Sequence, residues 1–250
     1  MHPECFHDNL SFARTLFVIQ PDEPAGASPS AALADATAIT PMLSCYSRSC
    51  GACEPRAVAS QWSKFVFARL VIPSLVLQCC LDRAIDFRTA PWAFTRGEDG
   101  TPAGFVFAAD PLGPVGTGHD YSSLIDDAIS PVIGALCAGA GLARRVYASN
   151  ASMYFAWALE QLEGQRRGQR HALAAARDLV ESAARPDGGF NPFHAPFKTL
   201  PQGCCDGNGE PASECRRLCC VRDLDACWGL CSNCPRAVKR EPACALADQA

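Results

Sequence analysis

Four cysteines late in the chain have the spacing of a metal-binding site. In RRLCCVRDLDACWGLCSNCPR, the adjacent pair Cys219-Cys220 is followed by ten residues, then Cys231, two residues and Cys234. The C-x2-C pair places two thiolates on a tight turn and serves zinc and iron–sulfur clusters alike. Neighbouring side chains tend to diverge, so Cys219 and Cys220 can share one centre only if the backbone turns sharply. We predict a thiolate-ligated metal centre, and the spacing alone leaves the metal open.

Cysteine is unusually abundant throughout the chain, with 16 residues in 250. Such density indicates either disulfides in an oxidising compartment or thiolate chemistry in a reducing one. The first residues, MHPECFHDNLSFARTLFVIQ, lack the basic start and the apolar run of about 7–15 residues that a secretory signal needs. We therefore expect a cytoplasmic, reduced chain, and association with the inner face of the membrane stays open.

A second group of cysteines lies nearer the N-terminus. Cys45, Cys50 and Cys53 have the opening spacing of a plant-type ferredoxin site. The only nearby fourth ligand would be Cys79 or Cys80, which belong to an apolar helical stretch where buried free cysteine is common. We expect incidental thiols here, with a second cluster as the alternative.

Charge and motifs exclude several function classes. The net charge of −4 and a pI near 5.7 provide no basic field, so we expect no nucleic-acid partner. The sequence contains no G-x-S-x-G elbow and no P-loop, and GAGLAR (139–144) only partly matches the dinucleotide fingerprint. Without a flavin or nicotinamide site, electrons would have to come from another protein or a small reductant.

Apolar periodicity predicts four helices and one hairpin. The helices cover about 57–81, 123–139, 150–162 and 170–184, with Asn150 as an N-cap and Gly139 or Gly141 near the end of the second. Pro73 should kink the first helix, whose polar interruptions favour a core helix over a membrane span. The hairpin pairs residues 92–94 with 105–107 around Asp99-Gly100, and the Pro/Ala-rich stretch 21–41 is predicted to be a flexible connector.

These elements predict an α+β fold with three parts. A variable N-terminal segment (1–54) includes the connector, and a mainly helical body with a short antiparallel hairpin or sheet covers 55–200. The segment 201–250 is loop-rich and loses apolar periodicity. Because such a segment cannot build its own core, we expect cysteine ligation of a metal centre to order it.

The cysteine motif, with Arg216 and Arg217 before it and Pro235 after it, resembles the signature of the FhuF-type ferric-siderophore reductases. Other stretches resemble the family as well, so the similarity covers roughly 55–236: ASQWSKFVFARLVIPSLVL, GEDGTPAG, RVYASNASMYFAWAL and RPDGGFNPFHAPFK. The resemblance implies a [2Fe–2S] cluster held by Cys219, Cys220, Cys231 and Cys234. It implies transfer of one electron to Fe(III) in a siderophore, release of Fe(II), and an electron-donor protein such as a ferredoxin or a reductase.

The chain also departs from the family pattern. Cys227 lies inside the ten-residue spacer, and Cys204, Cys205 and Cys215 lie just upstream, while Cys244 lies beyond the motif. Ligation by Cys227 or Cys215 in place of a motif cysteine is therefore an alternative. Two other functions stay open: a siderophore-binding protein with a structural zinc tail, and an iron–sulfur electron carrier that has no siderophore substrate.

Substrate-binding residues are not determined by the sequence. Polar residues in the similar stretches are candidates only: Ser60, Lys64, Arg144, Arg145 and Asn150. His194 could line the cluster but is more typical of an ordinary loop residue. Basic residues outnumber acidic ones around the motif, which predicts a positive rim for an acidic donor protein or an anionic chelate. The siderophore, the electron donor, the reduction potential and the oligomeric state stay open.

Overall fold

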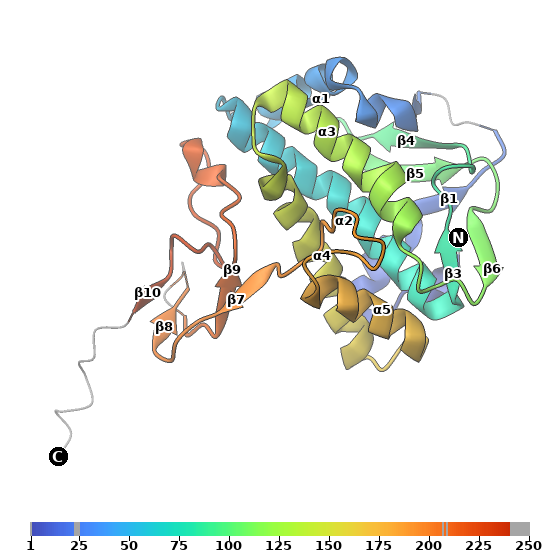
Figure 1. Ribbon diagram of the computed structural model, residues 1–250. Helices are drawn as coiled ribbons and strands as arrows, with labels where there is room; N and C mark the ends of the chain where they lie inside the picture. Colours follow the sequence, from blue (N-terminus) through green and yellow to red (C-terminus); the bar gives the residue numbers. More distant parts are fainter. Residues whose placement is uncertain (1, 23–25, 207, 209, 241–250) are drawn as a thin grey trace.

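The computed structural model describes residues 2–22, 26–206, 208 and 210–240. A helical body carries small sheets on one side, and a loop-rich C-terminal segment lies against its other side (Figure 1). This arrangement confirms the predicted α+β fold.

The long helix α2 (Pro55–Leu81) forms the centre of the body. Glu54 caps its N-terminus, and its residues are apolar nearly all round, with Trp62 and Leu70 fully buried. Its main packing partner is α4 (Arg144–Gly164). By length and composition α2 is the one described helix that could cross a membrane, but 67% of its apolar window is buried inside the protein. Such burial is what the predicted core helix requires.

The predicted hairpin forms as expected. Strands β4 (Trp92–Arg96) and β5 (Pro102–Phe107) pair antiparallel with Phe94 opposite Phe105. Gly100 in the turn has φ +80°, and an added Cβ would lie 2.7 Å from the Cys45 side chain, so glycine is needed there. Strand β1 (Phe17–Ile19) joins β5 in parallel and β2 (Ser28–Pro29) joins β4, which completes the sheet β1-β5-β4-β2. A separate pair is formed by β3 (Arg83–Ile85) and β6 (Leu112–Val115).

The N-terminal region belongs to the body. The short helices η1 (Pro3–Cys5), η2 (Asp8–Thr15) and η3 (Ser30–Ala34) precede α1 (Ala36–Cys50). The prediction of a flexible connector is therefore wrong for residues 28–41, and its residues 23–25 lie outside the described part. Widely spaced apolar residues order this stretch: Leu33 and Ile39 are each 1% exposed. Their burial depends on contacts of η3 and α1 with α3 (Ser130–Ala140), which local periodicity could not reveal.

The next two helices begin at residues other than those expected from the sequence. A π-helical turn, η4 (Leu124–Ile129), leads into α3, which ends at Gly141 in the left-handed conformation, as expected for a C-cap. The prediction of Asn150 as an N-cap is wrong, because α4 begins at Arg144 and Asn150 is completely buried inside it. Its amide bonds to α2 rather than to a helix end, as described below.

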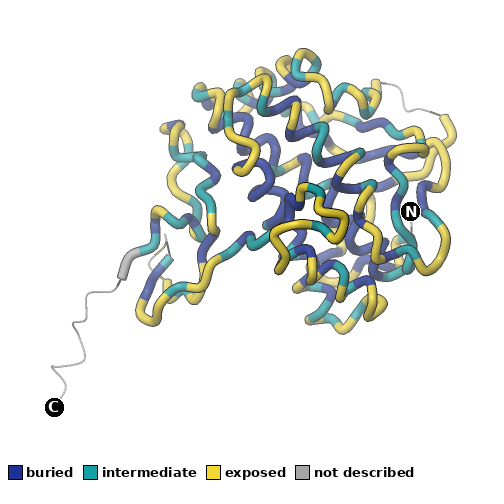
Figure 2. Tube along the Cα trace, viewed as in Figure 1, coloured by how far each residue is buried: buried dark blue, intermediate teal, exposed yellow. Residues whose placement is uncertain are grey.

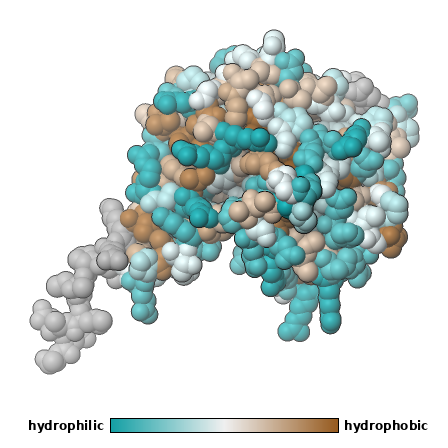
Figure 3. Space-filling view, in the orientation of Figure 1, coloured by the Kyte–Doolittle hydropathy of each residue, from teal (hydrophilic) through white to brown (hydrophobic). Residues whose placement is uncertain are grey.

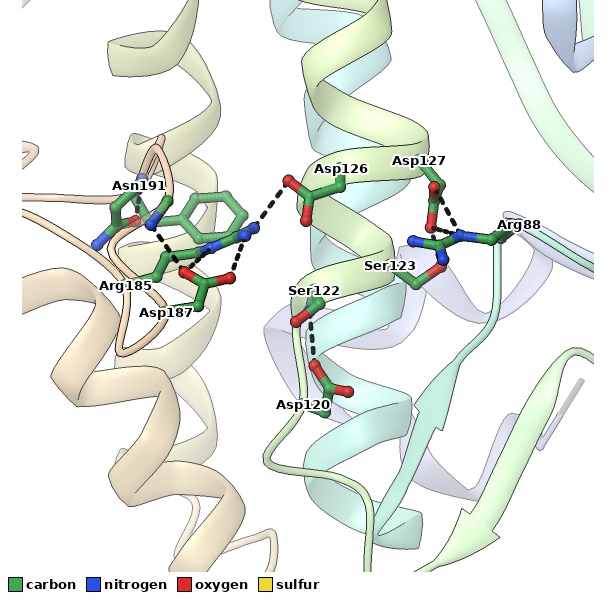
Figure 4. Close-up of polar contacts among 11 residues, drawn as sticks. Arg88, Asp120, Ser122, Ser123, Asp126, Asp127, Arg185, Asp187 and Asn191 are labelled. Atoms are coloured by element: carbon green, nitrogen blue, oxygen red, sulfur yellow. Dashed lines mark hydrogen bonds and ion pairs between the residues drawn. The ribbon is translucent and has the colours of Figure 1, made fainter.

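Helix α5 (Arg170–Glu181) ends before the expected boundary at 184, and ion pairs fasten the following loop. Figure 4 shows the Arg185 guanidinium between Asp126 and Asp187, at 2.8 and 2.6 Å. On the other side of η4, Arg88 pairs with Asp127 at 3.2 Å. The Arg185–Asp126 pair ties the loop that leads to the C-terminal segment onto the body.

The described residues from Phe197 onward, which include the C-terminal segment, form only short elements. Strand β7 (Phe197–Thr199) pairs with β9 (Glu214–Arg216), and β8 (Cys204–Cys205) pairs with β10 (Lys239–Arg240). One turn of 3-10 helix, η5 (Arg222–Leu224), lies next to α2. Figure 2 shows mostly intermediate and exposed residues here, in contrast to the buried helices of the body. Within the described residues, the hydrophobic core ends at Phe193.

Candidate metal centre

The four motif cysteines meet as two pairs of thiols. The Sγ atoms of Cys219 and Cys234 lie 3.7 Å apart. Cys220 and Cys231 form the second pair through a side-chain hydrogen bond. The structure therefore places the four motif residues as two pairs of thiols.

The backbone between the pairs turns sharply, as the adjacent cysteines required. Val221, directly after Cys220, has φ 51° in the left-handed region, which a β-branched residue rarely adopts. Its N–H donates to Cys219 Sγ at 3.3 Å. A conformation of this kind costs of order 1–3 kcal/mol and persists where its surroundings impose it. The strained residue thus turns the chain directly after the adjacent cysteines, which serve different pairs.

Helix α2 supplies the polar surroundings of Cys220. Lys64 Nζ lies 3.2 Å from Cys220 Sγ, and Gln61 Nε2 lies 3.8 Å from the same sulfur. Lys64 also donates to Gln61 Oε1 at 3.0 Å. The Ser60 hydroxyl donates to the Cys220 carbonyl at 2.6 Å. One turn of α2 thus contacts both the side chain and the backbone of Cys220.

A buried arginine and a buried asparagine connect α2, α4 and β9. The Asn150 amide donates to Ser60 O at 3.0 Å and Ser63 Oγ at 3.0 Å, and its oxygen accepts from Arg216 Nη2 at 2.7 Å. Arg216 is only 1% exposed, yet its Nε and Nη1 have no hydrogen-bond partner among the described residues. A buried cation with unsatisfied donors is costly unless a negative charge lies close to it.

These neighbours favour a thiolate at Cys220. The hydrogen bond from Cys231 lowers the pKa of Cys220, and the charges of Lys64 and Arg216 lower it further against the opposing effect of burial. The same hydrogen bond raises the pKa of Cys231. Burial raises the pKa of Cys219 and lowers the pKa of Lys64. Cys220 is therefore the motif sulfur best prepared to carry negative charge before any metal arrives.

The other candidate ligands make contacts of their own outside the two pairs or are buried in a strand. Cys227 Sγ hydrogen-bonds the Gly51 carbonyl at 3.0 Å, and Cys215 is buried within β9. The thiols of Cys45 and Cys50 donate to backbone carbonyls, of Glu98 at 3.4 Å and Tyr46 at 3.0 Å, respectively. Cys244 lies outside the described residues.

The spacing of the Cys219 and Cys234 sulfurs suits two thiolates on one metal, whether zinc or iron. Two sulfurs bound at about 2.3 Å to one tetrahedral metal lie about 3.8 Å apart, close to the spacing of Cys219 and Cys234. In the part of the chain that the structure describes, no three His, Cys, Asp or Glu side chains gather around one point that could hold an ion. A [2Fe–2S] cluster takes two protein ligands on each iron. The two thiol pairs and the unsatisfied donors of Arg216 suit such a negatively charged centre.

A cavity opens next to Cys220, where the C-terminal segment meets the body. Its volume is about 670 Å³, and Gln61, Lys64, Arg222 and Asn233 contribute polar groups to its wall. The remaining wall is apolar, with seven aromatic rings among its residues: Phe12, Tyr46, Phe65, Ala68, Ile72, Met153, Tyr154, Trp157, Phe197 and Trp228. Figure 3 shows hydrophobic side chains gathered on the left of the view, in the region of this junction.

The predicted positive rim is only partly correct. Arg216 is buried, and Arg236 forms an ion pair with Asp223. Asp225 accepts from the backbone N–H groups of Cys53 at 2.5 Å and Glu54 at 2.7 Å, so it anchors the segment to the body. The side chains of Lys239 and Arg240 lie outside the described part.

Three of the polar candidates belong to the network of contacts around Cys220, and two do not. Ser60, Lys64 and Asn150 belong to the contacts described above, whereas Arg144 lies over the Phe190 ring at 3.7 Å. Arg145 and His194 line another cavity, of about 360 Å³. Sequence reasoning missed Gln61 and the burial of Arg216. The signal for Gln61 was the stretch 60–64, in which four of five residues are polar within an otherwise apolar helix.

Comparison with known proteins adds no relative. No protein-family model matches the chain, and no curated protein matches it.

Proposed function

We propose that this protein is a cytoplasmic ferric-siderophore reductase of the FhuF type, with a [2Fe–2S] cluster on Cys219, Cys220, Cys231 and Cys234. The observation that carries the proposal is the meeting of these thiols as two pairs, one of them with its sulfurs 3.7 Å apart. The adjoining cavity supports a reductase over a simple electron carrier, because a carrier needs no site for a second small molecule.

The cluster would supply the transfer of one electron, which reduces Fe(III) in the chelate to Fe(II). An electron-donor protein such as a ferredoxin or a reductase would then replace that electron. Hard oxygen chelators hold Fe(III) far more tightly than Fe(II), so reduction releases the metal. No acid–base residue is required for this step.

The chain's own residues would bind the chelate and hold the charged groups around Cys220 in position. Gln61 and Lys64 contact Cys220 Sγ and also line the cavity, so only one layer of side chains separates the thiol from a bound chelate. Lys64 and the buried Arg216 offset negative charge at the site. The contacts of Ser60 and Asn150 hold these cations in place relative to the thiols.

Metal and sulfide content tests this proposal directly. Protein purified without oxygen should contain about two iron and two sulfide per chain, with a red-brown colour and a rhombic EPR signal after reduction. Colourless protein with stoichiometric zinc would overturn the reductase and support the structural zinc tail.

Variants locate the site, and rapid mixing tests the reaction. Cys220→Ser and Cys234→Ser should abolish the colour, whereas the matched control Cys50→Ser should keep it; the reverse pattern would relocate the centre. Reduced protein should be reoxidised when it is mixed with a ferric siderophore in a stopped-flow instrument. If no ferric chelate reoxidises it, the protein is an electron carrier instead.

A further inference from the structure

The cavity beside Cys220 is distinguished by its aromatic wall. Its seven rings come from five separated parts of the chain: η2, α1, α2, α4 and the C-terminal segment. Tyr46 stacks on Trp228 with ring centres 6.3 Å apart, and Arg69 lies over the Phe65 ring at 5.3 Å. A volume of about 670 Å³ suits a small-molecule ligand rather than a few waters.

The charged groups of this wall are all positive. Lys64 and Arg222 line the cavity, and no Asp or Glu is among its described lining residues. The Nε of Arg222 is buried and has no hydrogen-bond partner in the described part of the chain. Lys64 lies between the cavity and the Cys220 sulfur, so its charge can offset negative charge on both sides. The wall therefore favours an anionic ligand.

The tyrosines of the wall stay neutral. Burial raises the pKa of both Tyr46 and Tyr154 to about 12. Each phenol therefore keeps its proton at neutral pH and can donate a hydrogen bond to an oxygen of the ligand.

The rings and the cations together select for aromatic ligands. Aromatic side chains pair with other rings in stacked or edge-to-face arrangements, and a cation is attracted to a ring face. An aliphatic chelate would receive only apolar contact from the same wall, and a neutral or positive one would gain nothing from Lys64 and Arg222.

We propose that this cavity is the substrate site and that it takes an anionic ferric chelate whose metal-binding arms are aromatic rings, such as catecholates. This inference rests on the proposed function for the reaction, because it names the class of chelate that the reductase would accept. Binding itself requires only the cavity.

Gallium complexes test the inference without electron transfer, because Ga(III) mimics the size and charge of Fe(III) but is not reduced. Titration of the full-length protein with the Ga(III) complex of a tris-catecholate should quench the fluorescence of Trp157 and Trp228, which line the cavity. We expect its dissociation constant to be at least about tenfold below that of the Ga(III) complex of a trihydroxamate of similar size. Equal affinities, or tighter binding of the trihydroxamate, would overturn the proposal.

Two matched pairs of variants place the ligand. Phe65→Leu should weaken catecholate binding about fivefold or more, whereas Phe190→Leu, whose ring is similarly exposed at 39% against 36%, should leave it unchanged. Arg222→Gln should weaken the catecholate complex more than the trihydroxamate, and the surface control Arg177→Gln should affect neither. If Phe65→Leu and Arg222→Gln bind as the wild type does, the ligand does not occupy this cavity.

The outcomes separate the two proposals. If the protein lacks a cluster but binds the gallium catecholate in this cavity, the reductase fails and the binding site stands. If the reduced protein transfers electrons to ferric trihydroxamates while the catecholate does not bind, the reductase stands and the aromatic chelate fails.

Discussion

The body and the C-terminal segment are ordered by different forces. The body buries a continuous apolar core, and most residues of helix α2 are buried in it. After Phe197, most of the buried described residues are cysteines, and the others are one arginine, one aspartate and one alanine. They are Cys204, Cys205, Cys215, Arg216, Cys220, Asp225, Cys234 and Ala237. A segment of this composition gains little from the hydrophobic effect, which scales with the apolar area removed from water.

Polar contacts and thiols take the place of a core in the C-terminal segment. Arg216 bonds to Asn150, Ser60 binds the Cys220 carbonyl, and Asp225 binds two backbone N–H groups. Each net hydrogen bond contributes only about 0.5–1.5 kcal/mol, so such contacts dock the segment more than they fold it. The body should therefore fold by itself, whereas the segment depends on what its thiols bind.

Removal of the metal should have the largest effect, which we expect on the order of the C-terminal segment. We expect anaerobic treatment with an iron chelator to abolish amide protection across residues 201–240, because metal binding supplies folding free energy to segments without a core. The helical circular dichroism of the body should persist. Hydrogen exchange followed by mass spectrometry measures both regions in one experiment. Unchanged protection in metal-free protein would show that the C-terminal segment folds without a metal and would refute the proposed centre.

A cavity in the core should have a large effect on the body alone. Phe155 is completely buried and stacks on Phe193 with ring centres 3.9 Å apart. Phe155→Ala should lower the free energy of unfolding by about 3–5 kcal/mol, through lost burial and an unfilled cavity. Urea unfolding measures this loss, and the visible absorbance of the folded variant should stay that of the wild type.

The matched change in the C-terminal segment is Leu224→Ala, because Leu224 is 42% exposed. Its free energy of unfolding should stay within about 0.5 kcal/mol of the wild type. A loss as large as that of Phe155→Ala would show that the segment has a hydrophobic core after all.

Loss of the cation at Cys220 should alter the electronics of the site with little effect on folding. Lys64→Gln removes a positive charge 3.2 Å from the sulfur, which makes the reduced, more negative state less favourable. We expect the midpoint potential to fall by several tens of millivolts, where about 59 mV is a tenfold change for one electron. A redox titration followed by EPR measures the shift. Lys198→Gln, on exposed β7, is the control and should leave the potential unchanged.

The smallest expected effect concerns Asp225, the carboxylate that anchors the C-terminal segment to the body. Hydrogen bonds from the backbone N–H groups of Glu54, Cys227 and Cys53 lower the pKa of Asp225 to about 2. Because this pKa lies below the unfolded value of about 3.9, the stabilisation is fully present above about pH 4 and is lost as the pH falls towards 2. The difference in unfolding midpoint between wild type and Asp225→Asn should therefore be greatest at neutral pH and shrink in this window. A difference that is constant down to pH 3 would contradict the role of this carboxylate.

Short-range patterns predicted much of the fold. The alternation of Trp92, Phe94, Phe105 and Phe107 predicted a hairpin that forms with the expected pairing. The apolar run through α2 predicted its core helix, and Gly141 ends α3 as a left-handed cap. The same reasoning failed for Asn150 and for residues 28–41, because burial there depends on neighbours from distant parts of the chain.

The sequence by itself singled out four cysteines by their spacing, which is a local property, and left Cys227 and Cys215 open as alternatives. Only the tertiary structure decided that Cys219 pairs with Cys234 and Cys220 with Cys231, and that α2 presents Lys64 to one of these sulfurs. Ser60 and Cys220 are 160 positions apart in the chain, and no local period carries information over that separation. Their contact belongs to a network in which buried polar groups of α2, α4 and the C-terminal segment hydrogen-bond one another.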